Sequence, residues 1–72
     1  MSAMLHVVVN GRAAELPAGT NLAAALAAFG WDPAGTGFAV ALNGEVVPRR
    51  TWSATALGEA DRVEVLGAVQ GG

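Results

Sequence analysis

The sequence contains no cysteine, no tyrosine and no lysine, and only one histidine among its 72 residues. The absence of cysteine excludes disulfides, thiolate metal sites, iron–sulfur clusters and cysteine nucleophiles. A single histidine also leaves no cluster of imidazole ligands for a metal ion. The side chains that most often carry catalysis are therefore scarce, and we expect no metal site and no enzyme of these classes.

Positive charge is equally scarce, because the sequence has four arginines and six acidic residues, which gives a net charge of −2. Nucleic-acid binding needs clustered Lys and Arg, so we expect no nucleic-acid partner. The start of the chain has neither a basic region nor the apolar run of about 7–15 residues that marks a signal peptide. No run approaches the roughly 20 apolar residues that cross a membrane. We therefore expect a cytoplasmic protein with no membrane association.

Apolar residues are abundant and make up 53% of the chain, but alanine accounts for much of this share. The length corresponds to one small domain. Such a chain buries only about 60–65% of its unfolded surface, so its few large aliphatic side chains must form the core.

Two stretches, "MLHVVVNGRAAEL" and "FAVALNGEVVP", predict β-hairpins. Leu5, Val7 and Val9 alternate with other residues at the period of a strand. The Asn-Gly pairs at 10–11 and 43–44 suit type I′ turns, because both residues tolerate positive φ. The alanine-rich return of the first hairpin predicts an edge strand, since alanine has low strand propensity.

The stretch "PAGTNLAAALAAFG" predicts a helix. Thr20 is the candidate N-cap, and Gly30 suits the left-handed position that ends a helix. Leu22, Leu26 and Phe29 recur at helical spacing and predict a buried face. The alanines between them favour helix and allow close approach to a sheet.

The remaining segments predict a loop, an irregular stretch and a final strand. "WDPAGTG" is punctuated by proline and glycine, which indicates a loop. "RRTWSATALGEAD" predicts irregular structure with one helical turn, in which Trp52 and Leu57 pack under the core. "RVEVL" predicts a strand with Val63 and Val65 inward. Pro48 should end the returning strand of the second hairpin, because proline cannot donate to a ladder.

One helix covers only one face of a sheet, so these elements predict a two-layer α+β domain. The first and last strands carry the densest large aliphatics and are predicted at the sheet centre, in parallel, with the helix providing the crossover. This arrangement is the β-grasp, or ubiquitin-like, fold: a mixed sheet of about five strands packed on one main helix. We assign residues 1–66 to it and residues 67–72 to a flexible tail.

The polar and aromatic side chains that remain favour structural roles. We expect His6 to be solvated or packed rather than catalytic, because no carboxylate or nucleophile is evidently aimed at it. Glu59 and Asp61 predict a solvated turn. We expect the two arginines at 49–50 to be solvated, and the alternative is that they steer the acidic patch of a partner. Trp31, in a loop, is the better candidate of the two tryptophans for a contact.

The chain closes on "LGAVQGG", so its last two residues have no side chains. A C-terminal carboxylate becomes reactive when ATP converts it to an acyl adenylate. An activating enzyme must admit the main chain through a narrow channel, and a Cβ close to the carboxylate would clash there. Glycine makes up 10 of the 72 residues, so a terminal pair alone is weak support and a frayed end remains the alternative.

In combination, several stretches resemble the sulfur carrier proteins of thiamine biosynthesis, the ThiS family of ubiquitin-like bacterial proteins. They are "VVVNG", "LPAGTNLAAAL", "VALNGEVVPR", "DRVEVL" and "AVQGG", and together they cover essentially the whole chain. One departure is Ala60, where the family commonly carries glycine in a turn. This departure should reduce turn stability and does not affect the tail.

The resemblance implies that an adenylating enzyme of the ubiquitin-activating type uses ATP and Mg²⁺ to activate the carboxylate of Gly72. Sulfur from a cysteine-desulfurase persulfide would then replace AMP, and the resulting thiocarboxylate would supply sulfur to thiazole synthase. Ala68, Val69, Gln70 and Gly71 would thread into both partners. The carrier itself would bind no cofactor and would be a cosubstrate rather than an enzyme.

Three alternatives stay open from the sequence. A related carrier could serve molybdopterin synthesis, tRNA thiolation or cysteine synthesis with the same tail chemistry. A ubiquitin-like modifier would form an isopeptide bond with a partner lysine, although chains built on itself cannot form without lysine. A purely structural β-grasp domain would not need its final glycines.

Overall fold

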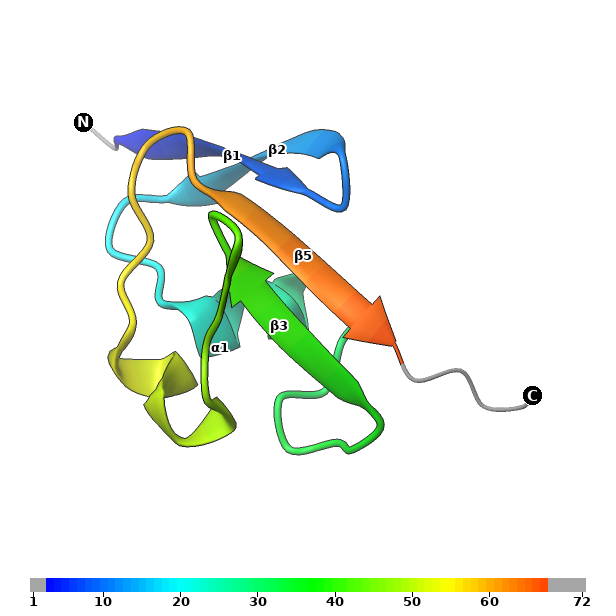
Figure 1. Cartoon of the computed structure of the whole chain (residues 1–72). Coiled ribbons are helices and arrows are strands. Elements are labelled where there is room, and N and C mark those ends of the chain that lie inside the picture. The colour runs from blue at the N-terminus through cyan, green and yellow to red at the C-terminus, as the bar shows by residue number, and fades with distance from the viewer. Residues whose placement is uncertain (1–2, 68–72) are drawn as a thin grey trace.

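The structure, a computed structural model, describes residues 3–67. The elements in chain order are β1 (Met4–Val9), β2 (Arg12–Pro17), α1 (Leu22–Ala28), β3 (Phe38–Leu42), β4 (Glu45–Val46), the 3₁₀-helix η1 (Arg49–Ala54) and β5 (Arg62–Gly67). The strands form one five-stranded sheet in the order β2-β1-β5-β3-β4. β1 and β5 pair in parallel, and every other pairing is antiparallel. The predicted β-grasp fold is confirmed, with β2 at one edge as expected (Figure 1).

The two Asn-Gly turns also fasten their hairpins to β5. Asn10 and Asn43 have φ of 50° and 52°, and the glycines that follow have φ of 82° and 88°, as a type I′ turn requires. The Oδ1 atom of Asn10 accepts the Val65 N–H at 2.8 Å, and that of Asn43 accepts the Arg62 N–H at 2.8 Å. Each dipeptide therefore reverses the chain and extends the pairing of β5.

The start of α1 differs from the prediction by one residue. Asn21, rather than Thr20, is the N-cap, and its side chain accepts the Ala24 N–H at 2.8 Å. The Thr20 hydroxyl instead donates to the Pro17 carbonyl at 2.6 Å. Thr20 was therefore the wrong candidate, because two adjacent residues could both cap and it is Asn21, with an extended backbone, that directs its side-chain oxygen at the first turn.

The end of α1 follows the prediction. Gly30 has φ of 91°, the left-handed conformation that ends many helices. The N–H of Gly30 donates to Ala27 O at 3.1 Å and that of Trp31 to Leu26 O at 2.9 Å. These two bonds form a Schellman motif, which satisfies carbonyls of the last helical turn and directs the chain into the loop before β3.

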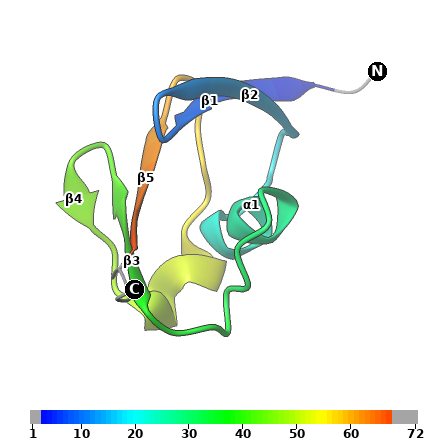
Figure 2. The same ribbon diagram turned by 90° about the vertical axis from the view of Figure 1, so that its right-hand side faces the viewer.

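The core lies between one face of the sheet and the layer of α1 and η1 (Figure 2). Trp52 and Leu57 are buried in it as predicted, and the Trp52 indole N–H donates to Val47 O at 2.8 Å. The buried cluster comprises Val7, Val9, Leu16, Leu22, Ala25, Leu26, Val40, Trp52, Leu57, Val63 and Val65.

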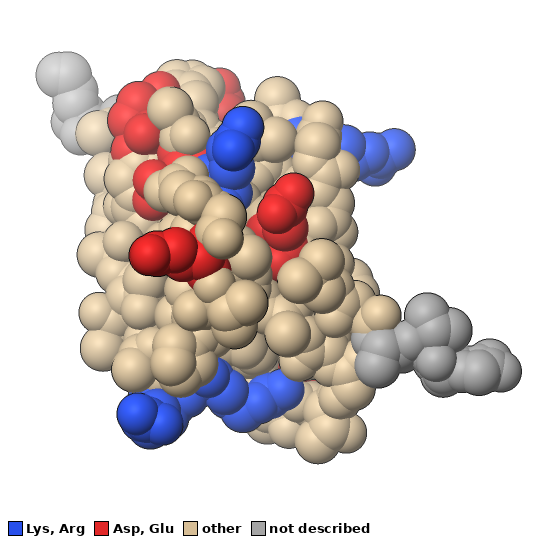
Figure 3. Space-filling model, viewed as in Figure 1, with Lys and Arg blue, Asp and Glu red and all other residues tan. Residues whose placement is uncertain are grey.

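The opposite face of the sheet, which we call the outer face, is not covered by a helix (Figure 2). Strand alternation and register place on it Met4, His6, Val8, Glu15, Ala39, Ala41, Val46, Arg62, Glu64 and Leu66. In Figure 1, α1 lies behind β3 and β5, so Figure 3 shows this part of the outer face with its acidic side chains. The three exposed large hydrophobic residues of the described chain, Met4, Val46 and Leu66, all lie here.

Candidate functional site at the end of β5

The residues predicted to react and to thread into partners, Ala68, Val69, Gln70, Gly71 and Gly72, lie outside the described residues. Their roles stay predictions. The structure does show the point from which they continue, because Gly67 is the last residue of β5. We call Gly67 the root of the tail.

The root lies at an open rim of the sheet (Figure 1). Gly67 pairs with Phe38, the first residue of β3, and Leu66 pairs with Ala39. A Cβ placed on Gly67 would meet no atom within 4 Å, and Leu66 is 52% exposed. Within residues 3–67, therefore, nothing packs over the end of β5.

An aromatic cluster surrounds Phe38, the residue of β3 that pairs with the root. The Phe38 ring lies 5.1 Å from that of Trp31 and 5.6 Å from that of Trp52, measured between centroids. Trp52 is buried, whereas Trp31 and Phe38 are half-buried. Trp31 thus packs against β3, the strand that pairs with the root, and the structure gives it a packing role at the rim of the core.

Arg49 completes this cluster and is exposed, as expected of the pair at 49–50. Its guanidinium carbon lies 4.5 Å from the Trp52 ring centroid and 5.2 Å from that of Phe38. One guanidinium N–H donates to the Pro33 carbonyl. The expectation did not include these contacts, in which a planar guanidinium stacks on aromatic faces that the fold brings together. Arg50 is exposed and shows no such stacking within the described chain.

A sequence signal for this contact was present. Arg49 and Trp52 are three residues apart, and in a 3₁₀-helix side chains at i and i+3 eclipse one another. Recognising a 3₁₀-helix rather than a generic helical turn would have placed the arginine over the indole. The further contact with Phe38 depends on tertiary packing and carries no local signal.

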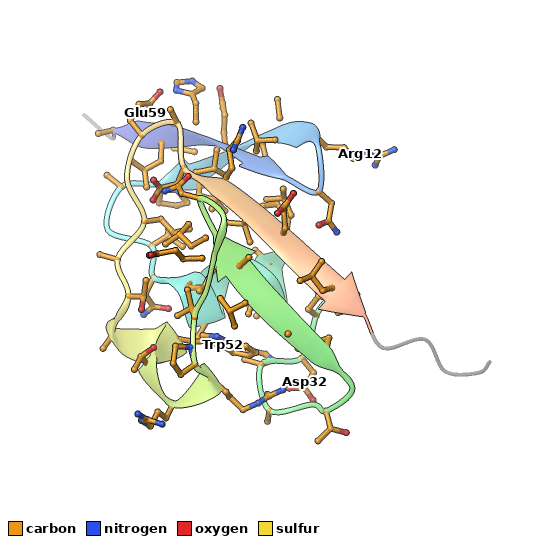
Figure 4. All side chains as sticks on the ribbon, viewed as in Figure 1. Arg12, Asp32, Trp52 and Glu59 are labelled. Atoms are coloured by element: carbon orange, nitrogen blue, oxygen red, sulfur yellow. The ribbon has the colours of Figure 1, made fainter. Side chains whose placement is uncertain are left out.

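A hollow of about 320 Å³ lies between the first hairpin and the end of α1. Its lining residues are Val9, Asn10, Arg12, Ala13, Ala14, Phe29 and Trp31. Arg12, the charged residue of this set, projects from the hairpin away from the body of the protein (Figure 4). The hollow therefore has no convergent polar groups of the kind that fix a small ligand.

His6 faces two carboxylates, so the expectation that none is aimed at it was wrong. Its Nδ1 lies 3.0 Å from Glu59 Oε2 and its Nε2 lies 3.2 Å from Glu15 Oε2. The register of β1 and β2 places Glu15 opposite His6, and the Ala60 N–H donates to His6 O at 2.7 Å, which docks the turn before β5. All three side chains are more than half exposed, which fits the expected solvated role.

Glu59 and Asp61 hold the turn before β5 through hydrogen bonds, beyond the purely solvated role expected of them. The backbone N–H of His6 donates to Glu59 Oε1 at 2.9 Å, and this bond is the main reason that the Glu59 pKa lies below its ordinary value. Asp61 accepts the Gly58 N–H at 2.7 Å and the Asn43 side-chain amide at 2.9 Å. Figure 4 shows Glu59 at the end of the sheet opposite the end of β5.

Between residues 3 and 67 there is no group of three or more His, Cys, Asp or Glu side chains that could hold a metal ion. No helix in this part of the chain is long and apolar enough to cross a membrane. The end of β5 therefore remains the candidate site, because it leads into the residues on which the sequence prediction rests.

Comparisons with known proteins agree on one family. The ThiS family model matches residues 7–72. A crystal structure of the thiamine biosynthesis protein ThiS from Geobacter metallireducens superposes with a TM-score of 0.78 and 30% identity, covering 94% of this chain and 100% of that one. None of the curated proteins matches the chain significantly. The match over both the body and the glycine-ended tail shows that this chain belongs to the ThiS family.

Proposed function

We propose that this protein is a sulfur carrier in thiamine biosynthesis and that its reacting group is the carboxylate of Gly72. The observation that carries the proposal is that the family match extends through residue 72, so it includes the terminal glycine pair as well as the folded body. The fold supports it, since β5 ends at an open rim and leads directly into the tail.

The proposed reaction begins when an adenylating enzyme of the ubiquitin-activating type binds the carrier with ATP and Mg²⁺. The Gly72 carboxylate attacks the α-phosphorus of ATP, pyrophosphate leaves, and an acyl adenylate forms. The terminal sulfur of a cysteine-desulfurase persulfide then attacks the acyl carbon and displaces AMP, which gives an acyl disulfide. A second thiol reduces this acyl disulfide, so that the thiocarboxylate is released and the two thiol sulfurs leave as a disulfide. Thiazole synthase accepts this sulfur. In each step the carrier is a cosubstrate, and ATP and Mg²⁺ belong to its partner.

Two properties of the tail suit this role. Gly71 and Gly72 have no Cβ, so a channel that admits only main chain can bring the carboxylate to the nucleotide. The segment 68–70 would occupy the approach to that channel, and it carries no charge that would have to be desolvated.

We assign recognition of the activating enzyme to the outer face of the folded body. Val46 and Leu66 are 66% and 52% exposed on this face, and Leu66 directly precedes the root. Large apolar side chains left in water at a sheet surface are typical of contact sites. An enzyme that covers this face would hold the tail beside its own active site.

The decisive experiment is an intact-mass measurement after incubation with the activating enzyme, ATP and a sulfur source. We expect the mass to rise by the difference between one sulfur and one oxygen atom. A variant that lacks Gly72 should keep its original mass, while its stability stays within about 0.5 kcal/mol of the unmodified chain. An unchanged mass in the unmodified chain, when a known carrier is converted alongside it, would contradict the proposal.

Complementation separates thiamine synthesis from other sulfur pathways. The carrier should restore growth of a thiazole-requiring strain without added thiamine. Rescue of molybdoenzyme activity, tRNA thiolation or cysteine synthesis without this growth would assign it to one of those pathways instead. Higher-mass adducts on partner lysines would indicate a protein modifier.

A further inference from the structure

Arg49 contacts Trp52 within its own helix η1 and two other segments, β3 and the loop that precedes β3. Its guanidinium lies 4.5 Å from the Trp52 ring centroid in η1 and 5.2 Å from the Phe38 ring centroid at the start of β3. Its hydrogen bond to Pro33 O ties in the loop that precedes β3. We propose that Arg49 is a positioning residue that holds Phe38 in place, so that the tail leaves the fold from one fixed point. This inference rests on the proposed function.

The pair that Arg49 supports is the last one of the ladder between β3 and β5. Phe38 is opposite Gly67, and beyond this pair no further pairing of β3 and β5 exists within the described residues. Terminal pairs fray unless side chains hold them. Gly67 has no side chain, so the cross-strand contacts that stabilise other pairs can come only from Phe38.

The chain on the other side of Phe38 does not restrain it. Gly37, which precedes it, has φ of 89°, and a Cβ built there would meet no atom within 4 Å. The backbone just before β3 is therefore a permissive link rather than a packed one. The ring of Phe38, set between Trp31 and Trp52 and covered by Arg49, is what fixes the start of the strand.

The state of this pair decides where the tail begins. When the pair is closed, the chain is held in the sheet as far as Gly67. When the pair opens, the ladder releases Gly67 and the last position that the sheet fixes lies further from Gly72. Once an enzyme has docked on the body, insertion of the tail is an intramolecular step, and its probability falls as the tether becomes longer and looser. We call the contacts of Arg49 with Phe38, Trp52 and Pro33 the clamp. Loss of the clamp should therefore lower kcat of the activating enzyme and leave docking of the folded body unchanged.

The test compares Arg49→Met, which keeps the length of the side chain, with Arg50→Met, which removes a neighbouring exposed arginine. Residue-resolved hydrogen exchange along the β3–β5 ladder reports on the clamp in the free carrier. Steady-state pyrophosphate release by the activating enzyme reports kcat and KM. Arg49→Lys, which keeps the charge but not the planar group, provides a second variant should Arg49→Met fail to fold.

For Arg49→Met we expect faster exchange at the Phe38–Gly67 end and unchanged exchange at the Leu42–Val63 end. We expect kcat to fall by about 3–10-fold with KM within about twofold, as for a lower effective concentration of the tail. Arg49→Lys should fall between Arg49→Met and the unmodified chain. Arg50→Met should match the unmodified chain in every measurement.

Three results would overturn the inference and leave the proposed function intact. Unchanged exchange at the ladder end would show that Arg49 does not clamp it, whatever the function of the protein. Faster exchange with an unchanged kcat would show that the clamp does not position the tail. A raised KM with an unchanged kcat would instead make Arg49 a contact for the enzyme. Failure of the unmodified chain to be activated would refute the proposed function itself, and the positioning role with it.

Discussion

The two faces of the sheet differ in what covers them. On the inner face Val7 and Val63 are 2% and 1% exposed beneath α1 and η1, whereas on the outer face Val46 and Leu66 are 66% and 52% exposed. An antiparallel sheet with one solvated face usually presents polar residues there. Folding explains the inner face completely, but it does not require the exposed apolar side chains of the outer face. The inner face therefore stabilises the domain, and the proposal that the outer face meets partners rests on this difference.

Charge follows the same division. No buried polar or charged side chain occurs in residues 3–67. Glu15 and Glu64 belong to the outer face, and Glu59 joins them through His6. Exposed charges contribute little to folding because water and salt screen them. Changes to these carboxylates should therefore alter contacts with partners more than they alter stability.

The largest expected effect is a loss of stability from a substitution in the core under the inner face of the sheet. Leu26 is fully buried in α1, and Leu26→Ala should reduce the free energy of unfolding by about 2–5 kcal/mol, because it leaves a cavity under the sheet. The control is Leu66→Ala on the outer face, with an expected change within about 0.5 kcal/mol. Denaturant unfolding measures both, and equal losses would abolish the distinction between the faces.

The next effect concerns recognition. Leu66→Asp should raise KM for activation by about tenfold, as expected when a charge enters the apolar part of an interface, with little change in melting temperature. Val46→Asp, on the same face but distant in sequence from the tail, should act in the same direction. Glu45→Gln, next to Val46 at the sheet edge, is the control and should leave KM unchanged. Wild-type KM in both Asp variants would remove the outer face from the proposed interface.

Most of the fold follows from local sequence signals. Two Asn-Gly turns, one helical periodicity and the aliphatic density of the first and last strands predict the hairpins, the helix and the central parallel pair, and the structure confirms them. Each of these signals acts within a few residues, where propensity and alternation suffice. The choice between Thr20 and Asn21 as the helix cap was missed because both residues have the required side chain and only backbone geometry separates them.

The features that sequence reasoning missed are contacts between distant segments. His6 and Glu59 are 53 positions apart, and Arg49 meets Phe38 only after β3 and η1 have packed on the same core. No periodicity encodes such contacts, because they depend on register and on the path of loops. The reacting residues stay a prediction, and the reasoning behind it is different, since a terminal glycine pair is proposed to matter through its lack of side chains.

A moderate effect is expected in the turn before β5. Ala60 has φ of 69°, a conformation that costs an L-residue about 1 kcal/mol. Ala60→Gly should therefore raise the free energy of unfolding by about 0.5–1 kcal/mol, after allowing for the greater freedom of glycine in the unfolded chain. Gly44→Ala, at φ of 88°, is the reciprocal change and should destabilise the second hairpin. A less stable Ala60→Gly variant would contradict the assignment of strain to this turn.

The smallest effect is a pH dependence carried by the outer face. The hydrogen bond from the His6 N–H holds the pKa of Glu59 below its ordinary value of 4.5 in the folded chain. A carboxyl with a lower pKa in the folded state stabilises it above the unfolded pKa and loses this contribution as the pH falls through the folded pKa. The loss should therefore begin near pH 4.5 and continue below it.

Glu59→Gln tests this contribution, because glutamine accepts the same hydrogen bond without a charge. The melting temperature of the unmodified chain should exceed that of the variant at neutral pH, and the two curves should converge as the carboxyl is protonated. Glu15→Gln is the control, because it alters the carboxylate on the other side of His6 and leaves the bond from the His6 N–H to Glu59 in place. The melting temperature of Glu15→Gln should therefore fall more steeply with acid than that of Glu59→Gln. Parallel curves for Glu59→Gln and the unmodified chain would show that this charge adds nothing to the fold. The outer face would then differ from the inner face completely, with all of its charges available to partners.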